Sequence, residues 1–206
     1  MFSIFLRHLL GVILAFMIRP AALVAETPEP YDKNFGGPRL GVNMTFGQSV
    51  AVGKSDPGLA WLFAVDGSFV MAQDTWTRME FGLEVGTGQS VFKMTSDKSS
   101  VELPHTYAMA KGGYGYSIGN HAFSVIRIGA GPVFGRYEGT LQGNKVASNS
   151  VTGLASMLGV DLVYPAGETG ELVGGFRVGY MTFSGDGIDS FQVRTPSLSL
   201  GFRILL

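Results

Sequence analysis

The chain has 206 residues with 15 basic and 16 acidic side chains, which is the length of a single domain. Charged residues make up 15% of it, against roughly 25% in soluble globular domains. The balance of charge argues against a nucleic-acid partner, which would require a concentrated basic surface. With no cysteine in the sequence, disulfides and thiolate metal sites are excluded.

Residues 1–25 predict an export signal. Arg7 and His8 precede an apolar run over residues 9–18, and residues 22–25 offer a small residue for cleavage before Glu26. The run is shorter than the about 20 apolar residues that a transmembrane helix needs. Removing this segment takes away two basic residues and no acidic one, so the mature chain is acidic.

Residues 26–37 predict a polar linker, broken by two prolines and a pair of glycines. After the linker, bulky apolar residues alternate with small or polar ones in eight segments. A period of two is typical of strands with one apolar face, and each segment is long enough for a tilted strand to cross a bilayer. The segments are residues 40–47, 60–69, 78–86, 105–116, 126–135, 153–164, 171–180 and 196–206.

Two segments show the alternation most clearly. In residues 78–86 the bulky side chains of Phe81, Leu83 and Val85 oppose charged residues and glycines. In residues 196–206 every second residue from Leu198 to the last is large and apolar, with serine, glycine or arginine between. Both patterns predict strands that present one face to hydrocarbon.

The connections between the segments are of two kinds. Tight turns are predicted at Asp74-Thr75, at Gly119-Asn120 and over residues 165–168. Longer loops rich in Gly, Ser, Asp, Asn and Lys are predicted over residues 53–58, 93–102, 138–150 and 184–190. Short turns at one end and long loops at the other are typical of the periplasmic and extracellular ends of an outer-membrane barrel.

Eight antiparallel strands could also form a soluble, lipocalin-like barrel with apolar residues inside. The small face decides against it, because Gly, Ala and Ser dominate where a water-facing exterior would carry long polar side chains. Small residues suit the crowded interior of a narrow barrel. The bulky set, with its tyrosines and tryptophans, suits lipid and the aromatic girdles near the headgroups.

The predicted inward face still carries charges of both signs, and in a narrow lumen they should pair with one another. Two hypotheses follow: a structural network of salt bridges that closes the lumen, or a gated ion path in which the pairs exchange. A wide pore is not expected from eight strands. The charges are Asp66, Arg78, Glu80, Glu84, Lys111, Arg127, Asp161, Glu171, Arg177 and Arg203.

Candidates for catalysis are few. Some small outer-membrane barrels modify lipid A with a His and a Ser or an acid, and His105 lies near Ser99, Ser100 and Glu102 in the sequence. His121 lies at a predicted tight turn on the opposite side. Neither matches a compact catalytic motif, so we expect rim or interfacial histidines, no catalytic residue, no cofactor and no metal site.

With the strands placed, the chain resembles the small eight-stranded outer-membrane barrels, such as the OmpA transmembrane domain, OmpX, the Ail attachment proteins and the opacity-like surface antigens. The resemblance covers residues 38–206 and rests on the signal, the strand rhythm, the charged lumen and the last strand. Barrels of this kind usually end in an aromatic residue that the assembly machinery recognises. This chain ends in Leu206, and its nearest aromatic residue is Phe202.

The sequence therefore predicts an all-β, eight-stranded antiparallel up-and-down transmembrane β-barrel over residues 38–206, after a signal (1–25) and a periplasmic linker (26–37). We expect it in the outer membrane of a Gram-negative bacterium, with a structural or surface-interaction role through extracellular loops. The expected partners are outer-membrane lipid and lipopolysaccharide, the barrel-assembly machinery and an extracellular ligand or host surface. A lipid A-modifying enzyme and a narrow gated ion channel are the alternatives.

Overall fold

The computed structural model describes residues 36–53, 55–72, 77–96, 99–118, 122–141, 144–167 and 169–206. The predicted signal and the linker up to residue 35 lie outside the described residues. So do three features predicted at turns, namely Asp74-Thr75, Gly119-Asn120 and His121. No helix in the described part of the chain is long and apolar enough to cross a membrane.

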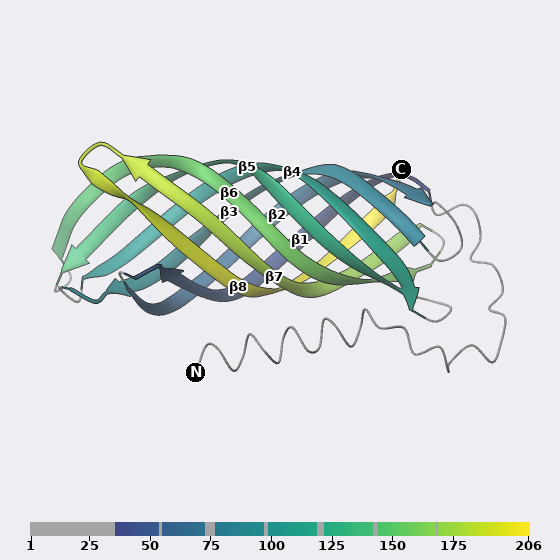
Figure 1. Cartoon of the computed structure of the whole chain (residues 1–206), viewed down its shortest axis with the longest axis horizontal. Helices are drawn as coiled ribbons and strands as arrows, with labels where there is room; N and C mark the ends of the chain where they lie inside the picture. Colours follow the sequence, from purple (N-terminus) through teal and green to yellow (C-terminus); the bar gives the residue numbers. More distant parts are fainter. Residues whose placement is uncertain are drawn as a thin grey trace.

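The described residues form eight strands that wind around one axis (Figure 1). Alternating small and bulky residues favour this geometry, because successive side chains of a strand point to opposite faces. The strands are β1 (Gly37–Ala51), β2 (Ser55–Ala72), β3 (Thr77–Met94), β4 (Ser100–Ile118), β5 (Ala122–Leu141), β6 (Asn144–Ala166), β7 (Gly170–Gly185) and β8 (Ile188–Leu205).

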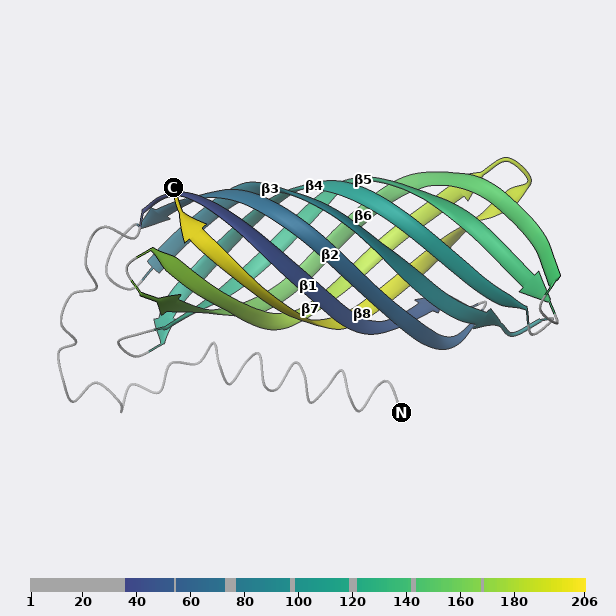
Figure 2. The ribbon, with the colours of Figure 1, turned by 180° about the vertical axis from the view of Figure 1, so that it is seen from behind.

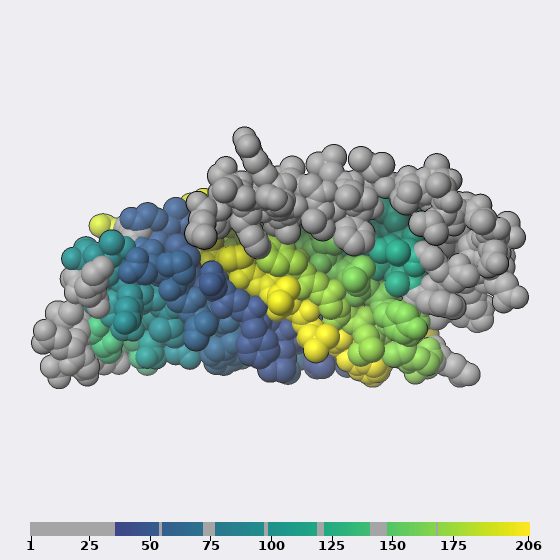
Figure 3. Space-filling view, turned by 90° about the horizontal axis from the view of Figure 1, so that it is seen from below, coloured from purple at the N-terminus to yellow at the C-terminus, as the bar shows by residue number. Residues whose placement is uncertain are grey.

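Each strand pairs antiparallel with its neighbours in sequence, and β1 also pairs with β8, so the sheet closes into a barrel. The closing ladder runs from Arg39 opposite Leu205 to Ala51 opposite Val193. Figure 2 shows the same ring of strands from behind, and Figure 3 shows the surface of β8 (yellow) between β7 (green) and β1 (blue). The predicted fold class, an all-β up-and-down barrel of eight antiparallel strands, is confirmed.

Both ends of the described barrel chain lie at one end of the barrel, where the C-terminus is marked in Figure 1. The turn between β6 and β7 is at this end, and Gly167 adopts a φ of 75° there, which glycine tolerates best. The opposite end holds the hairpin between β7 and β8, whose Gly187 has a φ of 72°. The predicted tight connection over residues 165–168 is shorter still, since Pro165 and Ala166 belong to β6.

The long loops predicted at the opposite end are wrong. The sheet continues through most of residues 53–58, 93–102, 138–150 and 184–190, so that β5 ends at Leu141 and β6 begins at Asn144. The physical reason is that polar composition does not prevent pairing where the alternation persists. The barrel therefore ends in tall hairpins rather than in extended loops.

The outer surface carries the bulky residues of the predicted apolar faces. Leu83 is 66% exposed and Leu200 is 70% exposed, although the adjacent Glu84 and Ser199 are buried. An apolar surface that continues around every strand is far larger than water-soluble monomers tolerate. It is what hydrocarbon requires, so the barrel spans a membrane.

The polarity of the two faces of the wall inverts toward the end that lies opposite the termini. In β7, Leu172 points outward near the turn, but farther along Met181 and Phe183 point inward and Thr182 outward. The other strands that reach this end also place apolar side chains inside and polar ones outside. Beyond the apolar band, the wall is thus built like that of a soluble barrel. We call this part, with outward residues such as Glu102, Thr182 and Gln192, the polar rim.

Candidate functional site

All ten predicted lumen charges lie on the inner face of the barrel, and none is more than 7% exposed. They come from every strand except β1, so residues far apart in the sequence meet inside the lumen. Alternation explains their direction, because each shares the parity of the small inward residues of its strand. Burial of this many charges requires that each one has partners.

Eight of the ten form a closed ring in which acid and base alternate. Its order is Glu80, Arg127, Asp161, Arg177, Glu84, Lys111, Asp66, Arg203 and back to Glu80. On one side of the ring the N–O distances are 2.7 Å from Glu80 to Arg127, 3.2 Å from Asp161 to Arg177 and 3.6 Å from Arg177 to Glu84, and Arg127 also pairs with Asp161. On the other side they are 3.2 Å from Glu84 to Lys111, 2.9 Å from Lys111 to Asp66, 3.3 Å from Asp66 to Arg203 and 3.1 Å from Arg203 to Glu80. We call these eight residues the charge ring.

The other two predicted charges extend the ring toward the turn end. Arg78 lies 2.5 Å from Glu80 and 3.1 Å from Glu171. Glu171 also lies 3.5 Å from Arg39, a buried base that the sequence reasoning does not include in the network. The signal for Arg39 is present, since it shares the parity of Gly41 and Asn43 on β1.

Three polar side chains that sequence reasoning does not assign to the network support its acids. The hydroxyl of Tyr107 donates a 2.7 Å hydrogen bond to Glu84, and Ser199 donates to Asp161 at 3.3 Å. Asn43 donates to Glu84 and accepts from Arg177. Tyr107 reaches the charge ring because Gly86, its register partner on β3, has no side chain to fill the space beside the phenol. Such bonds hold the carboxylates in one arrangement.

A second barrier lies inside the polar rim, beyond the charge ring. Phe183 stacks on Phe191 at 5.6 Å between ring centroids, and Tyr137 packs edge-on against Phe191 at 5.9 Å. Buried apolar residues of β3 to β8 complete this cluster. We call it the apolar layer: Phe92, Val101, Leu103, Val133, Val151, Phe183, Phe191 and Val193. The lumen is therefore filled twice, once by paired charges and once by hydrocarbon.

The residues considered for lipid A chemistry are not gathered into a catalytic group. His105 points into the barrel and is 4% exposed. Glu102 has the opposite parity, points outward and accepts a 2.9 Å hydrogen bond from Gln89. The barrel wall separates the imidazole from this carboxylate, so the two cannot act on one substrate.

No protein-family model matches the chain, and no curated protein matches its sequence. Solved structures do match. Neisserial surface protein A superposes with a TM-score of 0.52 at 16% identity, over 82% of this chain and 97% of that chain. A major outer membrane protein of Thermus thermophilus gives a TM-score of 0.48 at 15% identity, over 81% and 99%. The attachment invasion locus protein Ail of Yersinia pestis gives 0.44 at 17% identity, over 82% and 98%.

The fold is that of the small eight-stranded outer-membrane β-barrels. At such identities the likeness concerns the fold alone. The resemblance predicted from the sequence is confirmed at that level, and the chemistry of the lumen has to be argued from this chain's own residues.

Proposed function

We propose that this protein is a structural and surface-contact barrel of a Gram-negative outer membrane, with a lumen that is closed to solutes. The charge ring and the apolar layer, which block the lumen one behind the other, are the observation that carries the proposal. Eight strands leave an interior that side chains can fill. Solute passage would require both barriers to open together.

The surface that meets the exterior is the polar rim rather than a set of long loops. It stands beyond the apolar band, at the end opposite the termini, and displays side chains of both signs such as Arg136 and Glu138. The hairpins of the polar rim extend beyond the apolar band, whereas outward apolar residues such as Leu172 continue to the turns at the other end. Outer-membrane barrels keep their shorter extramembrane parts in the periplasm. This orientation places the rim outside the cell, where lipopolysaccharide and an external ligand or host surface would contact it.

Orientation can be tested by labelling, because the sequence contains no cysteine. A Gln192→Cys variant places one thiol on the exposed outer face of the polar rim, and a Thr169→Cys variant places one at the turn end. In intact cells, a membrane-impermeant maleimide is expected to label only the variant at position 192. Labelling of the variant at position 169 should require disruption of the outer membrane. The reverse pattern would contradict the proposed orientation.

The closed lumen can be tested by conductance in planar bilayers. The wild-type barrel is expected to be silent, and so is a Glu84→Gln variant, because the apolar layer would still block the lumen after the ring is weakened. A difference in gel migration between unboiled and boiled samples confirms that each protein is folded. Steady current steps in the wild type that change in the Glu84→Gln variant would instead support the gated ion channel.

A further inference from the structure

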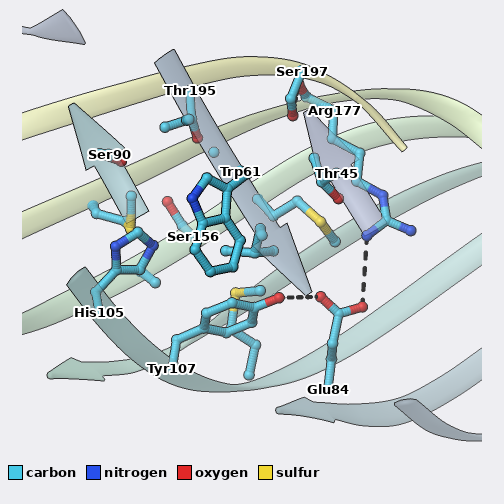
Figure 4. Close-up of a pocket in the computed structure, with 17 residues that line it drawn as sticks. Thr45, Trp61, Glu84, Ser90, His105, Tyr107, Ser156, Arg177, Thr195 and Ser197 are labelled. Atoms are coloured by element: carbon cyan, nitrogen blue, oxygen red, sulfur yellow. Dashed lines mark hydrogen bonds and ion pairs between the residues drawn. The ribbon is translucent and has the colours of Figure 1, made fainter. Parts of the chain in front are cut away.

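A small chamber lies between the charge ring and the apolar layer. Its volume is about 70 Å³, which exceeds the about 10–15 Å³ that a single bound water needs. Figure 4 shows its two ends, with His105 and Ser90 at one and Glu84 and Arg177 at the other. Most of its wall is apolar.

His105 presents a free nitrogen to this chamber. Its Nδ1 lies 2.9 Å from the carbonyl oxygen of Leu103, and since a carbonyl only accepts, Nδ1 carries the proton. The lone pair of the neutral ring is then on Nε2, which has no hydrogen-bond partner among the described residues. The ring is held edge-on against Phe183 at 6.3 Å and is 4% exposed.

Thioethers line the chamber beside this imidazole. Met181 is two residues from Phe183 on the inner face of β7 and lines the same chamber as His105. Met157 on β6 is opposite Gly179, one pleat from Met181, and also lines the chamber. Both methionines are at least nine-tenths buried. Met109 lines the chamber from β4.

These donors are neutral and mostly soft, which decides the class of ligand. No group of three His, Cys, Asp or Glu in the described part of the chain could hold a harder metal ion. The nearest carboxylate, Glu84, is already occupied by Tyr107 and Lys111. Thioether sulfur selects Cu(I) and ions like it over Zn²⁺, Mg²⁺ or Ca²⁺. The hydrogen bond from Nδ1 to a backbone carbonyl is the arrangement that usually orients a ligating histidine.

We propose that the chamber binds one soft monovalent metal ion, Cu(I) or its analogue Ag(I), through Nε2 of His105 and the thioethers of Met157 and Met181. The site lies in the lumen, between the charge ring and the apolar layer. The ion would therefore enter during folding or when one of these barriers opens transiently. Binding to the folded state alone would stabilise the barrel against unfolding.

Silver provides the test. The refolded barrel in detergent, with Ag⁺ added either during or after refolding, is expected to retain one ion per chain after gel filtration. His105→Ala, Met157→Leu and Met181→Leu should each weaken binding at least about tenfold, the least that metal sites lose when an orienting partner is removed. Met44→Leu is the matched control, because Met44 faces lipid. Its affinity should equal that of the wild type, and Zn²⁺ should not bind.

The leucine variants conserve side-chain volume, so they carry the test even if His105→Ala fails to fold on unboiled gels. X-ray absorption of the silver-loaded wild type is expected to show nitrogen and sulfur neighbours together. No retained ion in the wild type, as when the chamber holds water only, would overturn the proposal. So would retention of silver at unchanged affinity in both the Met157→Leu and Met181→Leu variants.

Discussion

Replacing Arg127 with methionine is expected to destabilise the folded barrel by about 3–5 kcal/mol, because two buried carboxylates lose their shared partner. Arg127 donates to Glu80 through two nitrogens, at 3.0 and 2.7 Å, and also to Asp161. All three side chains are almost fully buried, so neither acid can turn to water. Urea unfolding in phospholipid vesicles, followed by tryptophan fluorescence and by migration on unboiled gels, measures the change.

The matched control is Arg136→Met on the polar rim. The side chain of Arg136 is 62% exposed and lies 3.9 Å from Glu138. Exposed pairs of this kind contribute at most about 1 kcal/mol. If both variants lost the same small amount, the charge ring would not be what stabilises the lumen.

A rescue experiment separates the charge from the packing. Adding Glu80→Gln and Asp161→Asn to Arg127→Met removes the unpaired charges and should recover part of the lost stability. Recovery is expected to be incomplete, because Glu80 also serves Arg78 and Arg203. A triple variant less stable than Arg127→Met would mean that the remaining ring depends on those two acids more than on balanced charge.

Parity along the strands is enough to predict much of this molecule. Alternation alone assigns Leu83 and Leu200 to the lipid face and ten charges to the lumen, and all of them lie there. Such assignments are reliable because each side chain of a strand points to one of only two faces of the sheet.

Parity along a strand does not predict which inward charges form ion pairs with one another inside the barrel. Arg78 and Glu171 are 93 residues apart and meet across the lumen. Which inward residues share a level depends on the tilt and stagger of all eight strands at once. The alternating order of the charge ring is a property of the closed barrel, and no local pattern contains it.

The inversion at the polar rim is visible in the sequence but is masked by composition. Val101 and Leu103 alternate with Glu102 and Pro104, so the strand signal persists there with the opposite face apolar. Serine, lysine and glutamate in those segments favour loops on composition alone. A change of phase within a continuing alternation marks the level at which hydrocarbon gives way to water.

Replacing Leu83 with arginine is expected to destabilise the barrel in bilayers by about 2–4 kcal/mol, the cost of a base at the middle of the lipid face. Leu83 lies outward on β3 between Phe81 and Val85, beside Gly67 of β2 and Ala110 of β4. Neither neighbour offers a carboxylate to pair with the new charge. Unfolding of the wild type and of the variant in vesicles of the same lipid measures the change in stability.

Gln192→Arg places the same charge on the outward face of the polar rim, where the expected change is about 0–1 kcal/mol because the interface accommodates arginine. Both residues point outward from the same barrel, so the difference in destabilisation between the two variants measures how the cost of a charge depends on depth in the bilayer. A soluble barrel would instead tolerate both within about 0.5 kcal/mol, the usual effect of a surface substitution. Equal tolerance would therefore mean that water covers the leucine and phenylalanine band, and a charge ring inside a soluble barrel would need a different explanation.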